Sequence, residues 1–245
     1  MKRVMTPYEQ TQLARHGFSG APLTDTTPIE YVTGVAEFCG LKFGVNPSVL
    51  IPRVETEGLV EISLECISEK ITSANQLSII DVGTGSGAVI ISLAKHFEES
   101  SLPVQLHATD ISEEALKVAK ANAQQLTTTP IEFHLTSLLE NQKNRFDLIV
   151  ANLPYIPSEA VKKLDQSVIN HEPLLALDGG KDGFALIRKL LTTAPRNLNP
   201  HGSLILELDT SHTSEFFADF ENQFSITFFN DCFDRHRFAR LDLKN

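Results

Sequence analysis

The residues best suited to chemistry in this chain are Asn152-Leu153-Pro154-Tyr155, which directly follow the apolar run Phe146–Ala151. A short apolar run that stops at a proline turn is typical of a buried parallel strand, and open α/β sheets bind ligands at the carboxyl ends of such strands. The Asn side-chain oxygen and a neighbouring main-chain carbonyl can each accept a hydrogen bond from a planar NH2 group, while an aromatic ring stacks on its face. The tetrapeptide therefore predicts a binding site for a carboxamide or for the exocyclic amine of a base. An ordinary strand-ending turn is the alternative interpretation.

A second candidate site is Asp81-Val82-Gly83-Thr84-Gly85-Ser86-Gly87, where the apolar run Leu77–Val82 gives way to a helical pattern. Glycines at such a turn let backbone amides approach a ligand closely, which predicts a nucleoside cofactor. Their spacing fits both a nicotinamide cofactor and S-adenosylmethionine. Asp81 favours the second, because a carboxylate repels a pyrophosphate and attracts the ammonium and sulfonium groups of S-adenosylmethionine. Glycines that serve only tight helix packing are the alternative.

Asp110 follows the next predicted strand and places a carboxylate where the ribose hydroxyls of either cofactor would lie. The glycine loop and Asn152 are both predicted at carboxyl ends of neighbouring strands, where a methyl donor and an NH2 acceptor could meet. The combination predicts N-methylation. Amide and aryl-amine nitrogens are weak nucleophiles, so catalysis would consist mainly of in-line placement, with two acceptors holding the NH2 as it loses a proton. This scheme needs no metal, and the eight histidines show no ligand spacing along the chain, so we expect no metal site.

The elements that must position these residues alternate along the chain. A helix over Thr6–His16 and a β-hairpin within Tyr31–Leu50, with Cys39-Gly40 as its turn, precede a helix over Glu55–Lys70. Further strands are predicted at Leu77–Val82, Val104–Thr109, Ile131–Leu135, Phe146–Ala151 and Ser203–Leu208, and helices at Ala88–His96, Ser112–Gln125, Phe184–Thr193 and Ser211–Phe220. A closing strand pair is predicted at Phe224–Phe229 and Phe238–Leu243. The alternation predicts a doubly wound, Rossmann-like α/β sheet with a short N-terminal appendage.

Composition narrows the class of protein. A chain of 245 residues with 42% hydrophobic content can bury one α/β core. It has no apolar stretch near the roughly twenty residues of a membrane span and no apolar signal core at Met1–Gln10, so we expect a soluble cytoplasmic protein without membrane contact. Cys39, Cys66 and Cys232 fit neither a disulfide framework nor a zinc spacing and are predicted to be buried small hydrophobes. A net charge of −10 disfavours a nucleic-acid partner.

The chain contains further motifs outside the two candidate sites. They are Pro28–Gly34 leading to Phe38, Val49-Leu50-Ile51-Pro52-Arg53-Val54-Glu55-Thr56-Glu57, His171–Leu177, Gly179–Gly183 and Leu206-Glu207-Leu208. With these motifs, nearly the whole chain resembles the protein-(glutamine-N5) methyltransferases that modify the glutamine of the Gly-Gly-Gln loop of class-1 peptide chain release factors. Leu153 and Val54 replace prolines that are usual in that family, and the segment before the hairpin is shorter than its usual helical N-terminal domain.

The resemblance implies a class I methyltransferase sheet, S-adenosylmethionine as cofactor with S-adenosylhomocysteine as product, and a class-1 release factor as protein partner of a monomeric enzyme. It divides the chain into an N-terminal segment (1–27), a β-hairpin linker (28–52) and a methyltransferase domain (53–245). The implied cofactor contacts are Asp81, Gly83, Thr84, Gly85, Ser86, Gly87, Asp110, Ile111, Ser137, Leu138 and Asn152. The implied catalytic and substrate contacts are Asn152, Leu153, Pro154 and Tyr155.

The same resemblance implies roles for single residues. Asn152 would accept one amide N–H, the main-chain carbonyl of Leu153 would accept the other, and Tyr155 would stack on the amide plane. Ser137 would bind the adenine amine or cap a turn. Glu172 is expected to order its loop rather than to take part in the reaction.

Two other functions fit part of the sequence. Asn-Leu-Pro-Tyr is also similar to the motif of adenine N6-methyltransferases of RNA and DNA, because an adenine amine is as planar as a carboxamide. Those enzymes hold an extruded base beside phosphates, which favours a basic cleft, whereas this chain is acidic. The third hypothesis is a catalytically weakened relic, against which the presence of both Asp81 and Asn152 argues.

Overall fold

A seven-stranded sheet forms the centre of the computed structural model, which describes residues 5–18, 26–70, 76–98, 100 and 102–244. The strands, in spatial order, are β5 (Ile131–Leu135), β4 (Val104–Asp110), β3 (Leu77–Val82), β6 (Phe146–Ala151), β7 (Leu198–Glu207), β9 (His236–Leu243) and β8 (Phe224–Asn230). The first five run parallel, and β9 is antiparallel to both of its neighbours. This confirms the predicted doubly wound sheet and its closing strand pair.

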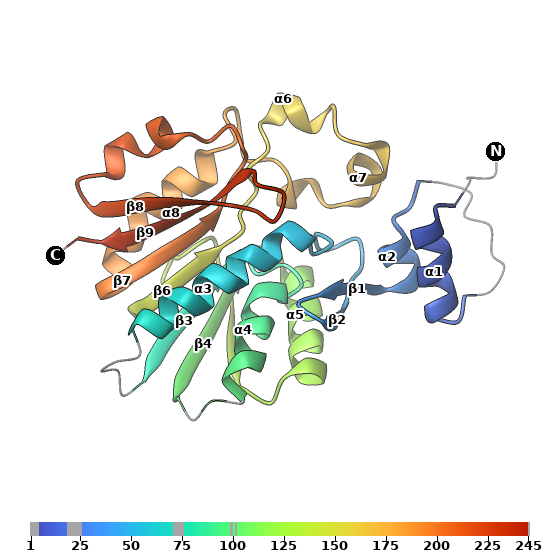
Figure 1. The fold of residues 1–245 in the computed structure, drawn as a ribbon, viewed down its shortest axis with the longest axis horizontal. Coiled ribbons are helices and arrows are strands. Elements are labelled where there is room, and N and C mark those ends of the chain that lie inside the picture. The colour runs from blue at the N-terminus through green and yellow to red at the C-terminus, as the bar shows by residue number, and fades with distance from the viewer. Residues whose placement is uncertain (1–4, 19–25, 71–75, 99, 101, 245) are drawn as a thin grey trace.

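Helices cover both faces of the sheet (Figure 1). On one face lie α3 (Glu57–Lys70), α4 (Ala88–Glu98) and α5 (Glu113–Leu126), and on the other lie α8 (Ala185–Asn197) and the 3-10 helix η3 (Ser214–Phe220). Consecutive strand residues point to opposite faces. Ile79 therefore packs in the core beneath α3 and α4, and Ile80 packs in the core beneath α8.

The N-terminal elements lie beside the end of α5, away from the closing strand pair (Figure 1). They are α1 (Pro7–Arg15), α2 (Ile29–Thr33), β1 (Val35–Phe38) and β2 (Leu41–Gly44). The hairpin and its turn at Cys39-Gly40 are confirmed, whereas Tyr31 and Val32, predicted as strand, lie in α2. Pro28 precedes this helical turn, and Gly34, with φ of 72°, ends it. Residues 1–4 and 19–25 of the predicted N-terminal segment lie outside the described residues.

The segment between β6 and α8, for which the sequence analysis proposed no helix or strand, departs most from the prediction. This segment contains α6 (Ser158–Val161), α7 (Gln166–His171) and the 3-10 helix η2 (Leu174–Ala176). All three are too short to show a helical period in the sequence. The predicted α-helix at Ser211–Phe220 is a 3-10 helix over its last seven residues, and β7 begins at Leu198 rather than Ser203.

Two further expectations can be compared with the described residues. Cys66 is buried and Cys39 is half-buried, but Cys232 is exposed, so the prediction of a buried side chain was wrong for Cys232, which lies between β8 and β9. In the part of the chain that the structure describes, no helix is both long and apolar enough to cross a membrane.

The sheet brings the two candidate motifs together. β3 and β6 are adjacent and parallel, and Val82 pairs with Ala151 at their carboxyl ends. The glycine loop and Asn152 therefore leave the sheet side by side, as predicted.

Candidate active site

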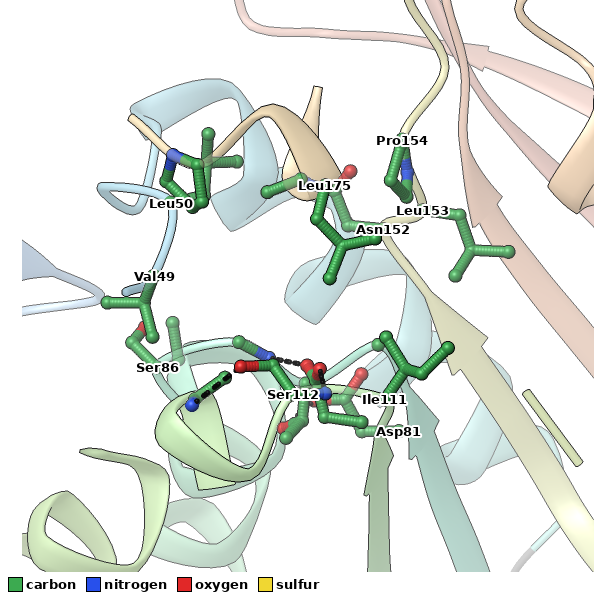
Figure 2. Close-up of a pocket in the computed structure, with 18 of the residues that line it drawn as sticks. Val49, Leu50, Asp81, Ser86, Ile111, Ser112, Asn152, Leu153, Pro154 and Leu175 are labelled. Atoms are coloured by element: carbon green, nitrogen blue, oxygen red, sulfur yellow. Dashed lines mark hydrogen bonds between the residues drawn. The ribbon is translucent and has the colours of Figure 1, made fainter. Parts of the chain in front are cut away.

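A pocket lies at the carboxyl ends of β3, β4 and β6 (Figure 2). In that view Asp81, Ile111 and Ser112 lie on one side, and Asn152, Leu153 and Pro154 lie on the other. The predicted site residues that line it are Asp81, Gly83, Thr84, Gly85, Ser86, Asp110, Ile111, Ser137, Leu138, Asn152, Leu153 and Pro154. Gly87 and Tyr155, also predicted as site residues, are not part of the lining.

The glycine loop turns over the end of β4. The backbone N–H groups of Gly83 and Thr84 both donate to the carbonyl of Thr109, each at 2.9 Å. Gly85 has φ of 54°, and a Cβ added there would meet no atom within 4 Å, so its open side faces the pocket. A ligand can therefore approach the backbone at Gly85 directly.

Gly87, predicted as a cofactor contact, lies outside the pocket lining. Its N–H donates to the carbonyl of Thr84 at 2.8 Å and is not available to a ligand. A Cβ at this position would lie 2.7 Å from Cδ1 of Ile91 and 3.3 Å from Cβ of Ala119. Gly87 therefore allows α4 and α5 to pack closely.

Two carboxylates lie on the cofactor side of the pocket. Asp81 is buried, and its Oδ2 accepts a hydrogen bond from Oγ1 of Thr84 at 2.7 Å. Burial, reinforced by the negative charge of Asp110, raises the pKa of Asp81 to about 7. Asp110 accepts from the N–H groups of Gly85 and Ser112, each at 2.9 Å, and burial raises its pKa as well. A buried carboxylate beside a half-buried one is costly without a cation, so this wall suits a ligand that carries positive charge and hydroxyl donors.

The Asn152 side chain is held by two partners from distant parts of the chain. Its Nδ2 donates to Oγ1 of Thr56 at 3.1 Å and to Oε2 of Glu207 at 2.9 Å. Both amide hydrogens are thereby engaged, which leaves Oδ1 as the group that Asn152 can offer to a ligand in the pocket. The site presents a hydrogen-bond acceptor here, as an NH2 ligand requires.

Tyr155 lies behind Asn152 rather than in the pocket wall. Its hydroxyl donates to Oε1 of Glu207 at 3.0 Å, and the guanidinium of Arg237 lies 5.9 Å from the ring centroid. Burial raises the pKa of Tyr155 and also that of Glu207. The phenol is thus part of the support for Asn152, and the predicted contact of Tyr155 with the substrate stays a prediction.

The rim of the pocket is fixed by an ion pair. Glu172 is buried, and it accepts from the guanidinium of Arg53 and from the N–H of Ile51, the latter at 3.4 Å. This pair ties the segment after β2 to the loop after α7, and Pro52 and Pro173 beside it both line the pocket. Glu172 orders the rim, in agreement with the prediction.

Three supporting residues were not predicted as part of the site. Glu207 is the last residue of the apolar strand β7, so the rule that ligands bind at strand ends could have found it. Thr56 belongs to the motif Val49–Glu57, but nothing in the sequence marks it as a partner of Asn152. Asn122 of α5 bonds both the N–H and the carbonyl of Gly44, at 2.7 and 3.0 Å, and the carbonyl of Ser86 at 2.8 Å, which joins the hairpin to the glycine loop.

Sequence comparisons agree with this geometry. A family described as a methyltransferase domain matches residues 73–236. Release factor glutamine methyltransferase of Geobacter sulfurreducens is 38% identical over 208 residues, which cover 84% of this chain and 68% of the relative. The protein of the same name from Lactococcus lactis is 38% identical over 218 residues, covering 88% of this chain and 77% of the relative.

Solved structures show the same fold at lower identity. The ribosomal protein L11 methylase of Lactobacillus delbrueckii subsp. bulgaricus aligns with a TM-score of 0.51 and 24% identity, over 79% of this chain and 80% of that one. A 16S rRNA N2 methyltransferase of Thermus thermophilus, solved with AdoMet and guanosine, aligns with a TM-score of 0.58 and 14% identity, over 86% of this chain and 50% of that one. At these identities the likeness concerns the fold alone.

Proposed function

The chain belongs to the family of release factor glutamine methyltransferases, and on that premise we propose that it transfers a methyl group from S-adenosylmethionine to the side-chain amide nitrogen (N5) of a glutamine in a peptide chain release factor. The observation that carries the proposal is the fixed orientation of Asn152. Thr56 and Glu207 bind both of its amide hydrogens, so Oδ1 is left to accept an N–H of the substrate amide.

The pocket suits the cofactor. Asp81 matches the ammonium group of S-adenosylmethionine, Asp110 matches ribose hydroxyls, and the bare backbone at Gly85 permits a close approach. The apolar side chains of Ile111 and Leu138 also line the pocket and could cover the adenine ring. When bound, S-adenosylmethionine supplies a methyl group on a positively charged sulfur, which makes that methyl group electrophilic.

The protein residues have to place the amide nitrogen, since that nitrogen is a weak nucleophile. Oδ1 of Asn152 would accept one N–H, and the main-chain carbonyl of Leu153 would accept the other. If the nitrogen takes the methyl group while the S–CH3 bond breaks and S-adenosylhomocysteine leaves, the nitrogen would become positively charged, and the two acceptors would stabilise that charge until one proton leaves to water. Glu207 and Tyr155 do not touch the substrate in this scheme; they hold Asn152 in position.

The charge of the chain supports a protein substrate over a nucleic acid. The formal net charge is −10, which weakens binding to a phosphate backbone. We place the reaction in the cytoplasm, where release factors act in translation, and we propose that one monomer carries a complete site, because both halves of the pocket come from the same chain.

Transfer of tritium from methyl-labelled S-adenosylmethionine tests the proposal. The purified chain is incubated with a class-1 release factor, with the same factor after Gly-Gly-Gln→Gly-Gly-Ala substitution, and with total rRNA. Label on the unmodified factor alone is the expected result. Label on rRNA, or equal label on both forms of the factor, contradicts glutamine methylation.

A further inference from the structure

Three potential metal ligands converge at the edge of the sheet, outside the pocket. His107 lies on β4, and Glu132 and His134 lie on the edge strand β5. In the parallel register His107 pairs with Glu132, and Thr109 pairs with His134, so all three side chains lie on one face of the two strands. The residues are not part of the pocket lining, and the proposed methyl transfer does not use them.

The distances between the three donor atoms distinguish one coordination geometry from another. Nδ1 of His107 lies 3.4 Å from Nε2 of His134 and 3.5 Å from Oε2 of Glu132, and Nε2 of His134 lies 3.9 Å from Oε2 of Glu132. Zinc holds nitrogen and oxygen donors at about 2.0–2.2 Å, so tetrahedral donors lie roughly 3.3–3.6 Å apart and octahedral neighbours about 2.9 Å apart. Two of the three separations match the tetrahedral value, and a rotation of the exposed Glu132 side chain brings in the third.

We propose that His107, Glu132 and His134 form a zinc site that clamps β5 to β4. Two imidazole nitrogens and one carboxylate oxygen are a donor set that zinc binds well. The Glu132 side chain is 70% exposed, so water can occupy the fourth position. The site goes beyond the proposed methyl transfer and carries a structural role, because it joins the edge strand β5 to its neighbour β4 in the sheet.

The surroundings of His107 preorganise this site. The ring is buried, it lies edge-on to Phe146 with centroids 5.3 Å apart, and it is stacked on His134 at an interplanar angle of 18°. These contacts hold the ring with Nδ1 close to the other two donors.

The clamp revises the prediction that the chain has no metal site. That prediction considered spacing along the sequence, and the Glu132-x-His134 pair alone is an ordinary period-two pattern of a strand. The third ligand comes from a neighbouring strand and is recognisable only after β4 and β5 are paired. Because β5 leads directly into Ser137 and Leu138, the clamp also anchors the strand that presents one wall of the pocket.

Zinc titration of the chelator-treated full chain, with a competing chromophoric chelator, tests the site. The exposed Cys232 could bind zinc by itself, so all proteins carry Cys232→Ser. We expect one zinc per chain and a rise in the thermal midpoint on zinc addition. His134→Ala and Glu132→Gln should each weaken zinc binding at least tenfold and abolish the rise, without changing the midpoint of the zinc-free protein by more than a few degrees.

His96→Ala is the matched control, because His96 is an exposed histidine on α4 outside the cluster. It should bind zinc as the parent does. The proposal is overturned if the parent binds no zinc, if His134→Ala binds as tightly as the parent, or if His96→Ala loses affinity to the same degree. Circular dichroism of each zinc-free variant distinguishes loss of the site from loss of the fold.

Discussion

The two halves of the pocket are built in different ways. The cofactor half consists of one loop, Gly83–Gly87, together with Asp81 and Asp110, and backbone N–H groups make its main contacts. The acceptor half is assembled from Thr56, Asn152 and Glu207, which are far apart in the sequence and act through side chains. Local turn chemistry is therefore enough to form the cofactor half. The acceptor half forms only when the three elements that carry Thr56, Asn152 and Glu207 have packed correctly.

The buried acids of the two halves, Glu207 and Asp81, differ in how far neighbouring groups offset their negative charge. Glu207 accepts hydrogen bonds from Asn152 and Tyr155 and lies near the charge of Arg237, and these neighbours offset part of the effect of burial, which raises its pKa. Asp81 has a single side-chain donor, Thr84, and the charge of Asp110 nearby works against it. The acceptor half is complete before any ligand arrives, while the cofactor half is completed by a cation.

Asn152→Ala should have the largest effect and should break the acceptor half alone. The substitution removes the acceptor for the substrate N–H, and we expect kcat for the release factor to fall by about 10³-fold. Affinity for S-adenosylmethionine, measured by calorimetry, should change by less than about threefold, because the cofactor wall is intact. A parallel loss of cofactor affinity would contradict the separation of the two halves.

Glu207→Gln should damage the acceptor half without touching the substrate. Gln has the same shape but turns one acceptor into a donor, so Asn152 either loses a partner or flips and presents Nδ2 to the pocket. We expect kcat to fall by about 100-fold, the scale of a small misplacement of a reacting group. Glu159→Gln is the control, since that side chain is exposed on α6 and pairs with Lys162 on the surface. Equal effects of the two substitutions would rule out a positioning role for Glu207.

Asp110→Ala should do the reverse and weaken the cofactor half. It removes the acceptor for ribose hydroxyls and also the bond that holds the N–H of Gly85 at 2.9 Å. A hydrogen bond to a charged group contributes about 1.5–3 kcal/mol, so the Kd for S-adenosylmethionine should rise by roughly 10- to 100-fold. At saturating cofactor kcat should recover most of its value. A kcat that stays low at saturation would mean that Asp110 also positions the substrate.

Cofactor affinity should depend on pH through Asp81. The pKa of this buried carboxyl is raised to about 7, so the free protein carries the neutral form below that pH. Because the ionised form attracts the ammonium group, we expect affinity for S-adenosylmethionine to fall by up to about tenfold per pH unit below 7. The raised pKa also favours the folded chain at low pH, and that contribution is lost as the pH rises from about 4 through 7. Asp81→Asn should bind weakly with a flat profile; an unchanged slope would assign the titration to another group.

The difference between the halves also explains what the sequence could predict. The strands, their order of alternation and the glycine loop follow from local patterns, and they were confirmed. Asn152 could be recognised because it follows a buried strand. Its support by Thr56 could not, because that contact joins residues 96 positions apart. Tyr155 was placed against the substrate by resemblance, whereas the structure gives its hydroxyl to Glu207, a contact that requires β6 and β7 to be neighbours.

Thr56→Val should have the smallest effect on kcat, and it tests most directly whether the acceptor half acts as one coupled unit. Valine keeps the shape but removes Oγ1, so one hydrogen of the Asn152 amide loses its acceptor while the bond to Glu207 stays. A neutral hydrogen bond contributes about 1 kcal/mol, and we expect kcat to fall about fivefold with an unchanged Kd for the cofactor. In the Glu207→Gln background the same substitution should cost more than fivefold, because Asn152 is then held by neither partner. Simple multiplication of the two effects in the double variant would mean that the contacts act independently, and that the acceptor half is not a single coupled unit.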